Sequence, residues 1–221
     1  CRKSKMLKLI KSHSCFYVPL FLILIIGGLY MPFFYKNGDW VLWFCKNFHP
    51  LNFQIFEYIT LLGEPQIMLP VILIIFLLNM GTGTLIFASW FSASMLTIIL
   101  KNIINSHRPP YYFKEIFEGC AGQIDFIYNH STPSGHTTAA FAFFASLALL
   151  TRYKTAQFTF FAFAVAVGVS RMVLFVHFYY DVYLGALIGG IVTLFIFWLF
   201  LDKNLFNFNT WKNKSILQRK L

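Results

Sequence analysis

The sequence predicts an all-α protein, a polytopic membrane bundle of six transmembrane helices with interfacial helices after the first. Three observations predict this fold class. Of 221 residues, 58% are hydrophobic and only 12% are charged, whereas a soluble domain is about 25% charged. Apolar runs of about 20 residues recur, and each is long enough to cross a ~30 Å hydrocarbon core. The aromatic content of 20% is mostly phenylalanine, which suits lipid-facing helices and interfacial belts.

The charges divide the chain into three parts. A basic N-terminus covers residues 1–15, the membrane domain covers residues 16–201, and a basic C-terminus covers residues 202–221. Basic residues that flank apolar runs set topology and contact anionic lipid head groups. The net charge of +10 therefore indicates the bilayer as a partner. No basic helix or aromatic platform indicates nucleic acid, and we expect no nucleic-acid partner.

The first half of the chain contains three predicted spans, at about residues 16–35, 60–79 and 84–104. The first is too long for a signal peptide, and no small-residue cleavage site follows it. Residues 37–59 mix tryptophan and phenylalanine with charges, which is typical of helices lying along the membrane surface. Pro65 and Pro70 predict kinks in the second span. Met80 to Gly83 predicts a tight turn before the third.

The second half contains the other three predicted spans, at about residues 134–151, 158–175 and 181–201. A polar and aromatic stretch, residues 105–132, precedes the fourth span. Residues 152–155 form a short basic loop before the fifth. Neither an internal repeat nor a low-complexity tract interrupts this pattern, so the membrane part is predicted to be one domain.

The positive-inside rule sets the predicted orientation. Six spans place both termini on one side of the membrane. With the termini inside, the inner segments carry twelve lysines and arginines and the outer segments carry six. The N-terminus and C-terminus are therefore predicted to be cytoplasmic. The polar clusters within the chain then all fall on the outer face.

Three short polar clusters interrupt the apolar chain, within residues 101–109, 133–136 and 170–181. Ionisable residues are costly inside a membrane protein and usually mark function there. Lys101, Arg108 and Arg171 supply three fixed positive charges, which suits a phosphate dianion. The planar fork of arginine adds bidentate hydrogen bonds to phosphate oxygens.

The remaining cluster residues suit catalysis as well as anion binding. Ser134 and Gly135 stand at a predicted helix N-terminus, where free backbone N–H groups bind anions. His177 and Asp181 are four residues apart, so on a continuous helix they face the same way. A carboxylate on one ring nitrogen orients the imidazole and makes the other nitrogen a better nucleophile. His136 is then available as a general acid.

These clusters resemble the signature of the type 2 phosphatidic acid phosphatase superfamily: K-x6-RP, PSGH and SR-x5-H-x3-D. All three parts match, in order and without substitution, between residues 101 and 181. The resemblance implies a hydrolase of phosphoric or diphosphoric monoesters that needs neither a metal nor another cofactor. It makes His136 the acid for the leaving group, His177 the nucleophile that forms a phosphohistidine, and Asp181 the residue that orients His177. The residues that hold the phosphate would be Lys101, Arg108, Ser134, Gly135 and Arg171.

The resemblance further implies a lipid phosphatase of the bacterial inner membrane with its active site facing the periplasm. Its substrate would be the phosphate or pyrophosphate of a membrane lipid, and lipid A and undecaprenyl pyrophosphate rank first. Phosphatidylglycerol phosphate and phosphatidic acid are alternatives that the signature does not separate. Two other classes stay open. One is a phosphatase for a soluble substrate or a vanadate-dependent haloperoxidase, and the other is a non-enzymatic transporter or scaffold with a vestigial site.

Four further features each have two interpretations. Cys45 and Cys120 both fall on the predicted outer side, as isolated thiols or as a disulfide. Gly185 and Gly189 in the sixth span indicate close helix packing or dimerisation, and the oligomeric state is open. The aromatic residues near Tyr111 floor a lipid entry or anchor the loop at the interface. His107 matches no signature position and is interpreted as a polar neighbour of the site.

Overall fold

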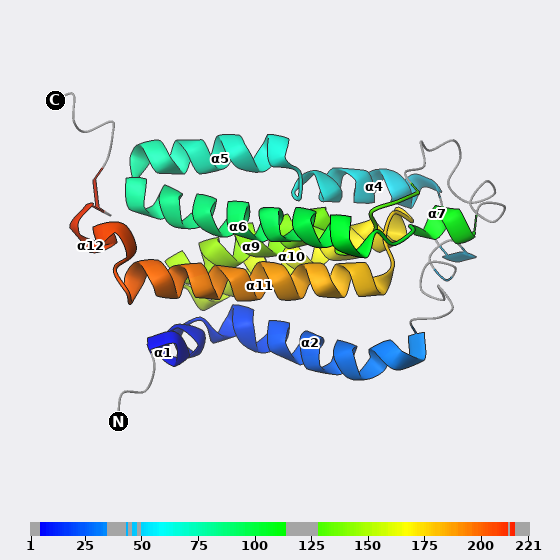
Figure 1. The fold of residues 1–221 in the computed structure, drawn as a ribbon, viewed down its shortest axis with the longest axis horizontal. Coiled ribbons are helices and arrows are strands. Elements are labelled where there is room, and N and C mark those ends of the chain that lie inside the picture. The colour runs from blue at the N-terminus through cyan, green and yellow to red at the C-terminus, as the bar shows by residue number, and fades with distance from the viewer. Residues whose placement is uncertain are drawn as a thin grey trace.

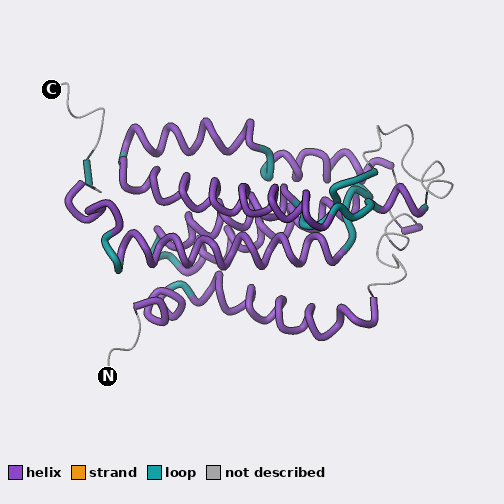
Figure 2. The backbone as a smooth tube through the Cα atoms, in the orientation of Figure 1, coloured by secondary structure: helices purple, strands orange, loops and turns teal. Residues whose placement is uncertain are grey.

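The computed structural model describes residues 5–34, 43, 46–47, 50–113, 128–211 and 213–214. Within these ranges the chain consists of helices and connecting loops, with no strand (Figure 2), so the all-α prediction is confirmed. The described helices are α1 (Lys5–Ser12), α2 (Ser14–Phe34), α4 (Pro50–Leu61), α5 (Pro65–Leu78), α6 (Met80–Ile104), α7 (Pro109–Tyr112), α9 (Gly135–Leu150), α10 (Lys154–Val173), α11 (Tyr179–Leu201), the 3-10 helix η1 (Leu205–Asn207) and α12 (Phe208–Trp211).

The described helices are those of an integral membrane protein. Four stretches are long and apolar enough to cross a bilayer: Phe53–Leu78, Met80–Tyr112, Lys154–Val173 and Tyr179–Leu201. Helices α1 and α2, which meet at 101°, make a fifth if they are one broken span. Helix α9 takes the place of the fourth predicted span, but its 16 residues rise only about 24 Å. The count of six spans therefore stays a prediction.

The second predicted span begins earlier than the sequence indicated. Most of residues 37–49 lie outside the described ranges, so the interfacial helices predicted there cannot be compared. The described part, α4, runs on toward α5 (Figure 1), and residues 53–78 together are apolar enough for one span. For residues 53–59, the structure therefore does not support a separate surface helix. The break between the two helices falls at Leu62 to Glu64, directly before Pro65.

The tight turn predicted at Met80 to Gly83 is wrong, because these residues form the first turn of α6. The chain reverses one residue earlier, at Asn79, whose side-chain oxygen accepts a hydrogen bond from the Thr82 N–H at 2.9 Å. Gly83 serves the close crossing of α5 and α6. A Cβ at this position would lie 2.3 Å from Phe76 Cα. Only glycine therefore lets α6 approach the α5 backbone this closely.

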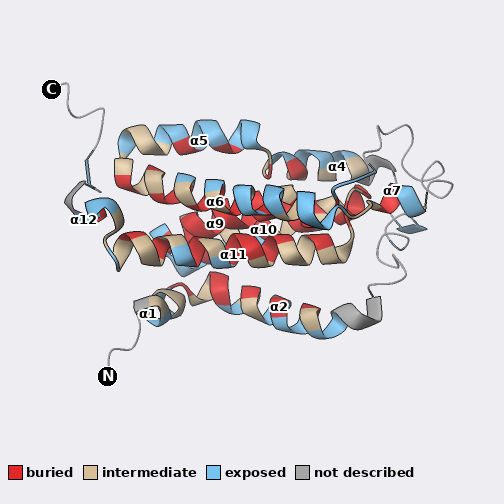
Figure 3. Ribbon diagram, viewed as in Figure 1, coloured by how far each residue is buried: buried red, intermediate tan, exposed pale blue. Residues whose placement is uncertain are grey.

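Helix α9 forms the centre of the bundle and packs on α6, α10 and α11 (Figures 1 and 3). Its buried face is rich in alanine, with Ala140, Ala142 and Ala145 fully covered. Small residues let helix backbones approach closely, which drives helix association in lipid. The matching glycines are on α11: a Cβ at Gly185 or Gly189 would lie 2.8 Å from Ser134 O or 2.6 Å from Thr138 O. Gly185 and Gly189 are therefore used for close packing between α11 and α9 within the chain.

The two ends of the bundle differ. Helices α1 and α12 lie together at one end, and α7 lies at the other (Figure 1). Helix α6 runs toward the α7 end, α9 and α11 begin there, and α10 finishes there. The three polar clusters are therefore brought to one end of the bundle by four different helices.

Candidate active site

The junction between α10 and α11 positions His177 and Asp181. The chain turns after Val173, and the backbone N–H of His177 donates to Arg171 O at 3.2 Å. His177 precedes α11 and Asp181 lies in its first turn, so the two are not on one continuous helix. The predicted contact is nevertheless present, with Nδ1 3.3 Å from Asp181 Oδ2. A carboxylate only accepts, so Nδ1 carries the hydrogen and Nε2 keeps a free lone pair.

The surroundings of His177 keep its imidazole neutral. The side chain is 1% exposed, and burial lowers the pKa of His177 to about 3, against the raising effect of the Asp181 hydrogen bond. Because burial holds the pKa below its ordinary value of 6.5, the ring is neutral at pH 7. A neutral ring has the lone pair that a nucleophile needs.

Asp181 is held by more donors than His177 alone. Ser131 Oγ donates to Oδ2 at 2.5 Å, and Thr132 Oγ1 donates a short hydrogen bond to Oδ1. The Phe178 N–H donates to Oδ2 at 2.9 Å. The carboxylate is thereby fixed in one orientation, and through it the ring of His177. The sequence interpretation missed Ser131 and Thr132. The only available signal was that two hydroxyl residues directly precede the PSGH motif.

The hydroxyl donors to Asp181 give a first testable prediction. Thr132→Val removes the donor to Oδ1 and keeps the side chain's shape. The hydrogen bond that Thr132 Oγ1 accepts from Ser106 Oγ is lost as well. We expect kcat for hydrolysis of a phosphate ester, the activity that the motifs imply, to fall by about tenfold, because the weakened hold on Asp181 costs roughly 1–2 kcal/mol. KM should stay within about twofold, because Thr132 acts on the histidine rather than on the phosphate. Steady-state kinetics of purified protein measure both values, and a KM effect alone would contradict this role.

The segment after α6 carries Arg108 back toward the bundle. Lys101 and Arg108 are seven residues apart, so they would share a face if one helix continued through both. Instead α6 ends at Ile104, followed by Asn105 in the left-handed conformation at φ 42°, and Pro109 begins α7. The two cations still meet, because residues 106–108 pair with residues 128–132. The Ser131 N–H donates to Ser106 O at 3.0 Å, and the Arg108 N–H donates to Tyr128 O at 2.8 Å.

The three predicted cations gather around the His177–Asp181 pair. Lys101 lies within electrostatic range of Arg108, Arg171 and Asp181, and His177 lies within range of Arg108 and Arg171. Lys101 Nζ donates to His130 O at 2.9 Å, and Arg108 Nε donates to Asn129 O at 3.1 Å. These contacts aim the two side chains, and neither forms an ion pair with another described residue.

Arg171 shows the clearest unmet hydrogen-bonding capacity. Its Nη1 donates to Thr60 Oγ1 at 2.7 Å. Its Nε is buried and has no partner in the described part of the chain. An unpaired buried donor costs about 1–3 kcal/mol of stability. It is expected only where a further group, such as a ligand, accepts its hydrogen bond. An anion among the three cations would supply that acceptor.

The PSGH motif forms the start of α9, as predicted. Ser134 is the residue before the helix and is fully buried. Its backbone N–H donates to Asp181 O at 2.9 Å, which ties the start of α9 to α11. Its Oγ accepts from Thr137 Oγ1 at 2.9 Å, so its own hydrogen stays available. A Cβ at Gly135 would lie 3.9 Å from Lys101 Cε, so the first N–H groups of α9 lie beside that lysine.

His136 follows in α9 and makes one side-chain hydrogen bond in the described structure. Its Nε2 lies 3.0 Å from Glu64 Oε1 at the break between α4 and α5. His136 also lies within electrostatic range of Arg171 and Lys101. It therefore belongs to the same cluster as the nucleophile candidate. Glu64 and Thr60 were not predicted, because nothing in their local sequence marks them.

Several features near this end of the bundle have other roles. His107 stacks on Tyr111 with ring centroids 3.9 Å apart, and its Nδ1 lies 2.8 Å from Asn129 Oδ1, as expected for a polar neighbour. Tyr111 is 54% exposed. The positions of Cys45 and Cys120 lie outside the described residues, so their pairing stays open. Among the residues that the structure describes, no group of three histidine, cysteine, aspartate or glutamate side chains is placed to hold a metal ion.

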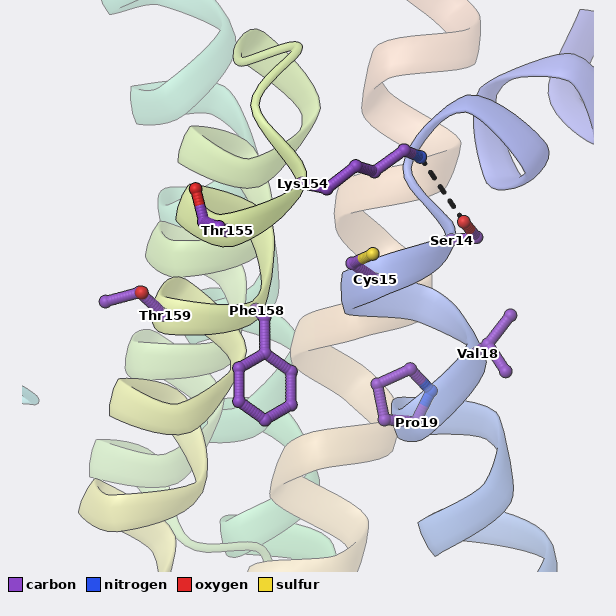
Figure 4. A pocket seen from close by; sticks show the side chains of 8 residues that line it. All are labelled: Ser14, Cys15, Val18, Pro19, Lys154, Thr155, Phe158 and Thr159. Carbon is purple, nitrogen blue, oxygen red and sulfur yellow. Dashed lines mark hydrogen bonds between the residues drawn. The ribbon is translucent and has the colours of Figure 1, made fainter.

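A surface groove of about 890 Å³ lies elsewhere on the molecule, between the start of α2 and the start of α10 (Figure 4). Its lining residues are Ser14, Cys15, Val18, Pro19, Lys154, Thr155, Phe158 and Thr159. Lys154 begins the helix whose last turn carries Arg171, so the groove lies about 25 Å along α10 from the cations. It is not the site of the polar clusters.

The fold and the site together define a class, an integral-membrane helical bundle with three cations gathered around a carboxylate-paired histidine. The model of the PAP2 superfamily matches residues 82–205, which include all three motifs. The chain therefore belongs to the PAP2 superfamily, and the resemblance stated from the motifs is confirmed.

Similar proteins agree with this family. A lipid A 1-phosphatase from Rhizobium etli is 35% identical over 112 residues, which cover 49% of this chain and 46% of that protein. The match thus spans less than half the length of this relative. The crystal structure of Aquifex aeolicus LpxE has a TM-score of 0.61 at 24% identity, over 72% of this chain and 92% of the other. That of a transmembrane PAP2 type phosphatidylglycerolphosphate phosphatase from Bacillus subtilis has a TM-score of 0.63 at 23% identity, over 85% and 96%. These two structures share the fold.

Proposed function

We propose that this protein is a membrane lipid phosphatase that hydrolyses a lipid phosphate monoester through a phosphohistidine. The observation that carries the proposal is the buried, neutral His177 among three cations. Its Nδ1 is occupied by Asp181, and Arg171 beside it has an unpartnered buried donor. Charge neutralisation and positioning are what phosphoryl transfer requires of a protein.

In the first step, His177 Nε2 attacks the phosphorus and the P–O bond to the lipid breaks. Lys101, Arg108 and Arg171 neutralise the phosphoryl oxygens, while the Ser134 hydroxyl and the backbone at Gly135 donate further hydrogen bonds. Asp181 stabilises the positive charge that develops on the ring of His177. His136 gives a proton to the departing lipid oxygen, so the lipid leaves as an alcohol.

In the second step, water attacks the phosphohistidine. His136, now neutral, takes a proton from this water, the N–P bond breaks, and His177 is released with inorganic phosphate. Every proton and charge in this cycle is handled by side chains of the chain itself. We therefore propose that the reaction needs no metal ion.

The proposed substrate is the phosphate of lipid A, because the relative from Rhizobium etli is a lipid A 1-phosphatase. Phosphatidylglycerol phosphate and phosphatidic acid carry the same phosphate ester and are competing substrates. Undecaprenyl pyrophosphate is a third, in which the same attack on the terminal phosphorus would release the lipid monophosphate instead of an alcohol. The proposed location is the bacterial inner membrane, with cytoplasmic termini and the site toward the periplasm. The distribution of lysine and arginine supports this orientation.

Phosphate release from a panel of these four lipids tests the proposal, with protein purified in detergent. We expect release from lipid A that vanadate inhibits, because vanadate mimics the phosphoryl group in the anion site. We expect EDTA to leave the rate unchanged. Loss of activity in EDTA would refute metal independence. Faster release from another lipid would make that lipid, and not lipid A, the substrate. Absence of release from every lipid would favour a transporter or scaffold.

A further inference from the structure

The break between α4 and α5 contributes two side chains to the cluster that no signature motif contains. Glu64 reaches His136 from 72 residues away in sequence, and Thr60 reaches Arg171 from 111 residues away. Thr60 is buried, and Glu64 is 29% exposed. One turn of chain thus contacts both the proposed general acid and a proposed phosphate ligand.

The break between α4 and α5 packs closely on its neighbours, so the fold itself holds Glu64 and Thr60 in place. Gly63 packs between α9 and α10, where a Cβ would lie 3.1 Å from His136 O on α9 and 2.8 Å from Val167 Cγ1 on α10. A side chain at this position would push the break away from His136. The backbone N–H of Gly63 also donates to Thr60 O at 2.8 Å, so the turn holds the two polar side chains in a fixed relation.

The chemistry of His136 needs a negative partner. The charged groups around it are Arg171 on α10, Lys101 on α6 and Glu64 at the α4–α5 break. The two cations oppose a positive charge on the ring, and among the described residues Glu64 is the group that favours it. Because a carboxylate only accepts hydrogen bonds, Glu64 also fixes the hydrogen on Nε2. Nδ1 makes no hydrogen bond within the described structure, so it is the nitrogen left to exchange a proton with substrate.

We propose that Glu64 and Thr60 are positioning residues of the active site: Glu64 holds His136 ready to donate from Nδ1, and Thr60 fixes the Arg171 guanidinium against the phosphate. This inference rests on the proposed phosphatase function. Glu64 acts through His136 on proton transfer to the leaving lipid, whereas Thr60 acts through Arg171 on binding of the phosphate. The two side chains therefore have separable kinetic effects.

Two variants with matched controls test these roles in the full-length purified protein. Glu64→Gln keeps the size and removes the charge, and Glu57→Gln makes the same change at an exposed position of α4. Thr60→Val removes the hydroxyl, and Thr159→Val does so at an exposed position of α10. The substrate is the lipid phosphate that the unmodified protein hydrolyses fastest.

We expect Glu64→Gln to lower kcat by about tenfold, the effect of a one-unit change in proton affinity, with KM within about twofold. The high-pH limb of its kcat profile should move to lower pH. Thr60→Val should instead raise KM several-fold and leave kcat nearly unchanged. Either variant behaving like its control would overturn the role of that residue. If both variants showed the same fall in kcat and the same rise in KM, the segment would have a merely structural role.

An NMR titration of the His136 ring gives a readout that does not depend on turnover. The signal is assigned by its loss in His136→Ala. We expect the midpoint in Glu64→Gln to lie about one pH unit below that of the unmodified protein, and Glu57→Gln to leave it in place. An unchanged midpoint in Glu64→Gln would refute the charge coupling, even in a protein that releases no phosphate. Lack of phosphate release with a shifted midpoint would refute the proposed function and keep the coupling.

Discussion

His177→Ala is expected to abolish both the phosphoenzyme and turnover. Nε2 of this ring is the one nitrogen in the described cluster that combines a free lone pair, a carboxylate on the opposite nitrogen and three neighbouring cations. Alanine leaves the anion site in place, because none of Lys101, Arg108 and Arg171 bonds to the His177 side chain. Phosphate should therefore still bind while the rate falls by roughly 10³-fold or more, as in other enzymes that lose a nucleophile.

Acid-sensitive, alkali-stable labelling of the protein by a radioactive lipid phosphate measures the phosphohistidine directly. The unmodified protein should be labelled, and His177→Ala should not be. His107→Ala is the matched control, because this histidine lies at the same end of the bundle, stacks on Tyr111 and has no assigned role. A labelled His177→Ala protein would exclude His177 as the nucleophile. Retained vanadate binding in this variant would show that the anion site is intact.

The motif residues could be identified from the sequence because they lie at fixed, short separations along the chain. His177 and Asp181 are four residues apart, and the turn between α10 and α11 brings them into contact as a continuous helix would have done. The PSGH motif could be placed at a helix start because a mainly apolar stretch, residues 139–150, follows it. Lys101 and Arg108 would share a face only on one continuous helix, and the helix does not continue to Arg108. Asn105 ends α6 in the left-handed conformation, and the pairing of two loops carries Arg108 to the site.

The partners of the motif residues could not be predicted, because they come from distant segments. Thr60 and Glu64 belong to a break in a helix that only the tertiary fold brings against α9 and α10. Ser131 and Thr132 lie beside the motif, but only the tertiary fold brings their hydroxyls within hydrogen-bond distance of Asp181 on α11. The turn predicted at Met80 to Gly83 failed for a related reason. Gly83 serves the contact with Phe76 on a neighbouring helix, and no local pattern distinguishes this use of glycine from a turn.

His136→Ala has the second-largest expected effect, a fall in kcat of roughly 10²-fold or more, the usual contribution of a general acid. The leaving group from a lipid phosphate is an alkoxide, a poor leaving group unless it is protonated as the P–O bond breaks. His177 remains intact in this variant, so the phosphoenzyme should still form, only slowly. Single-turnover labelling, which follows the rate of phosphoenzyme formation separately from its hydrolysis, measures the effect.

The dependence on leaving group distinguishes an acid from a structural residue. p-Nitrophenol leaves readily as an anion, so an aryl phosphate needs little protonation. If His136 supplies the proton, His136→Ala should lose much more activity on the lipid than on p-nitrophenyl phosphate, and Glu64→Gln should show the same preference more weakly. A simple disturbance of the fold would reduce both substrates equally. Near-normal hydrolysis of the lipid by His136→Ala would refute the acid role, and with it the reason for Glu64 to face this ring.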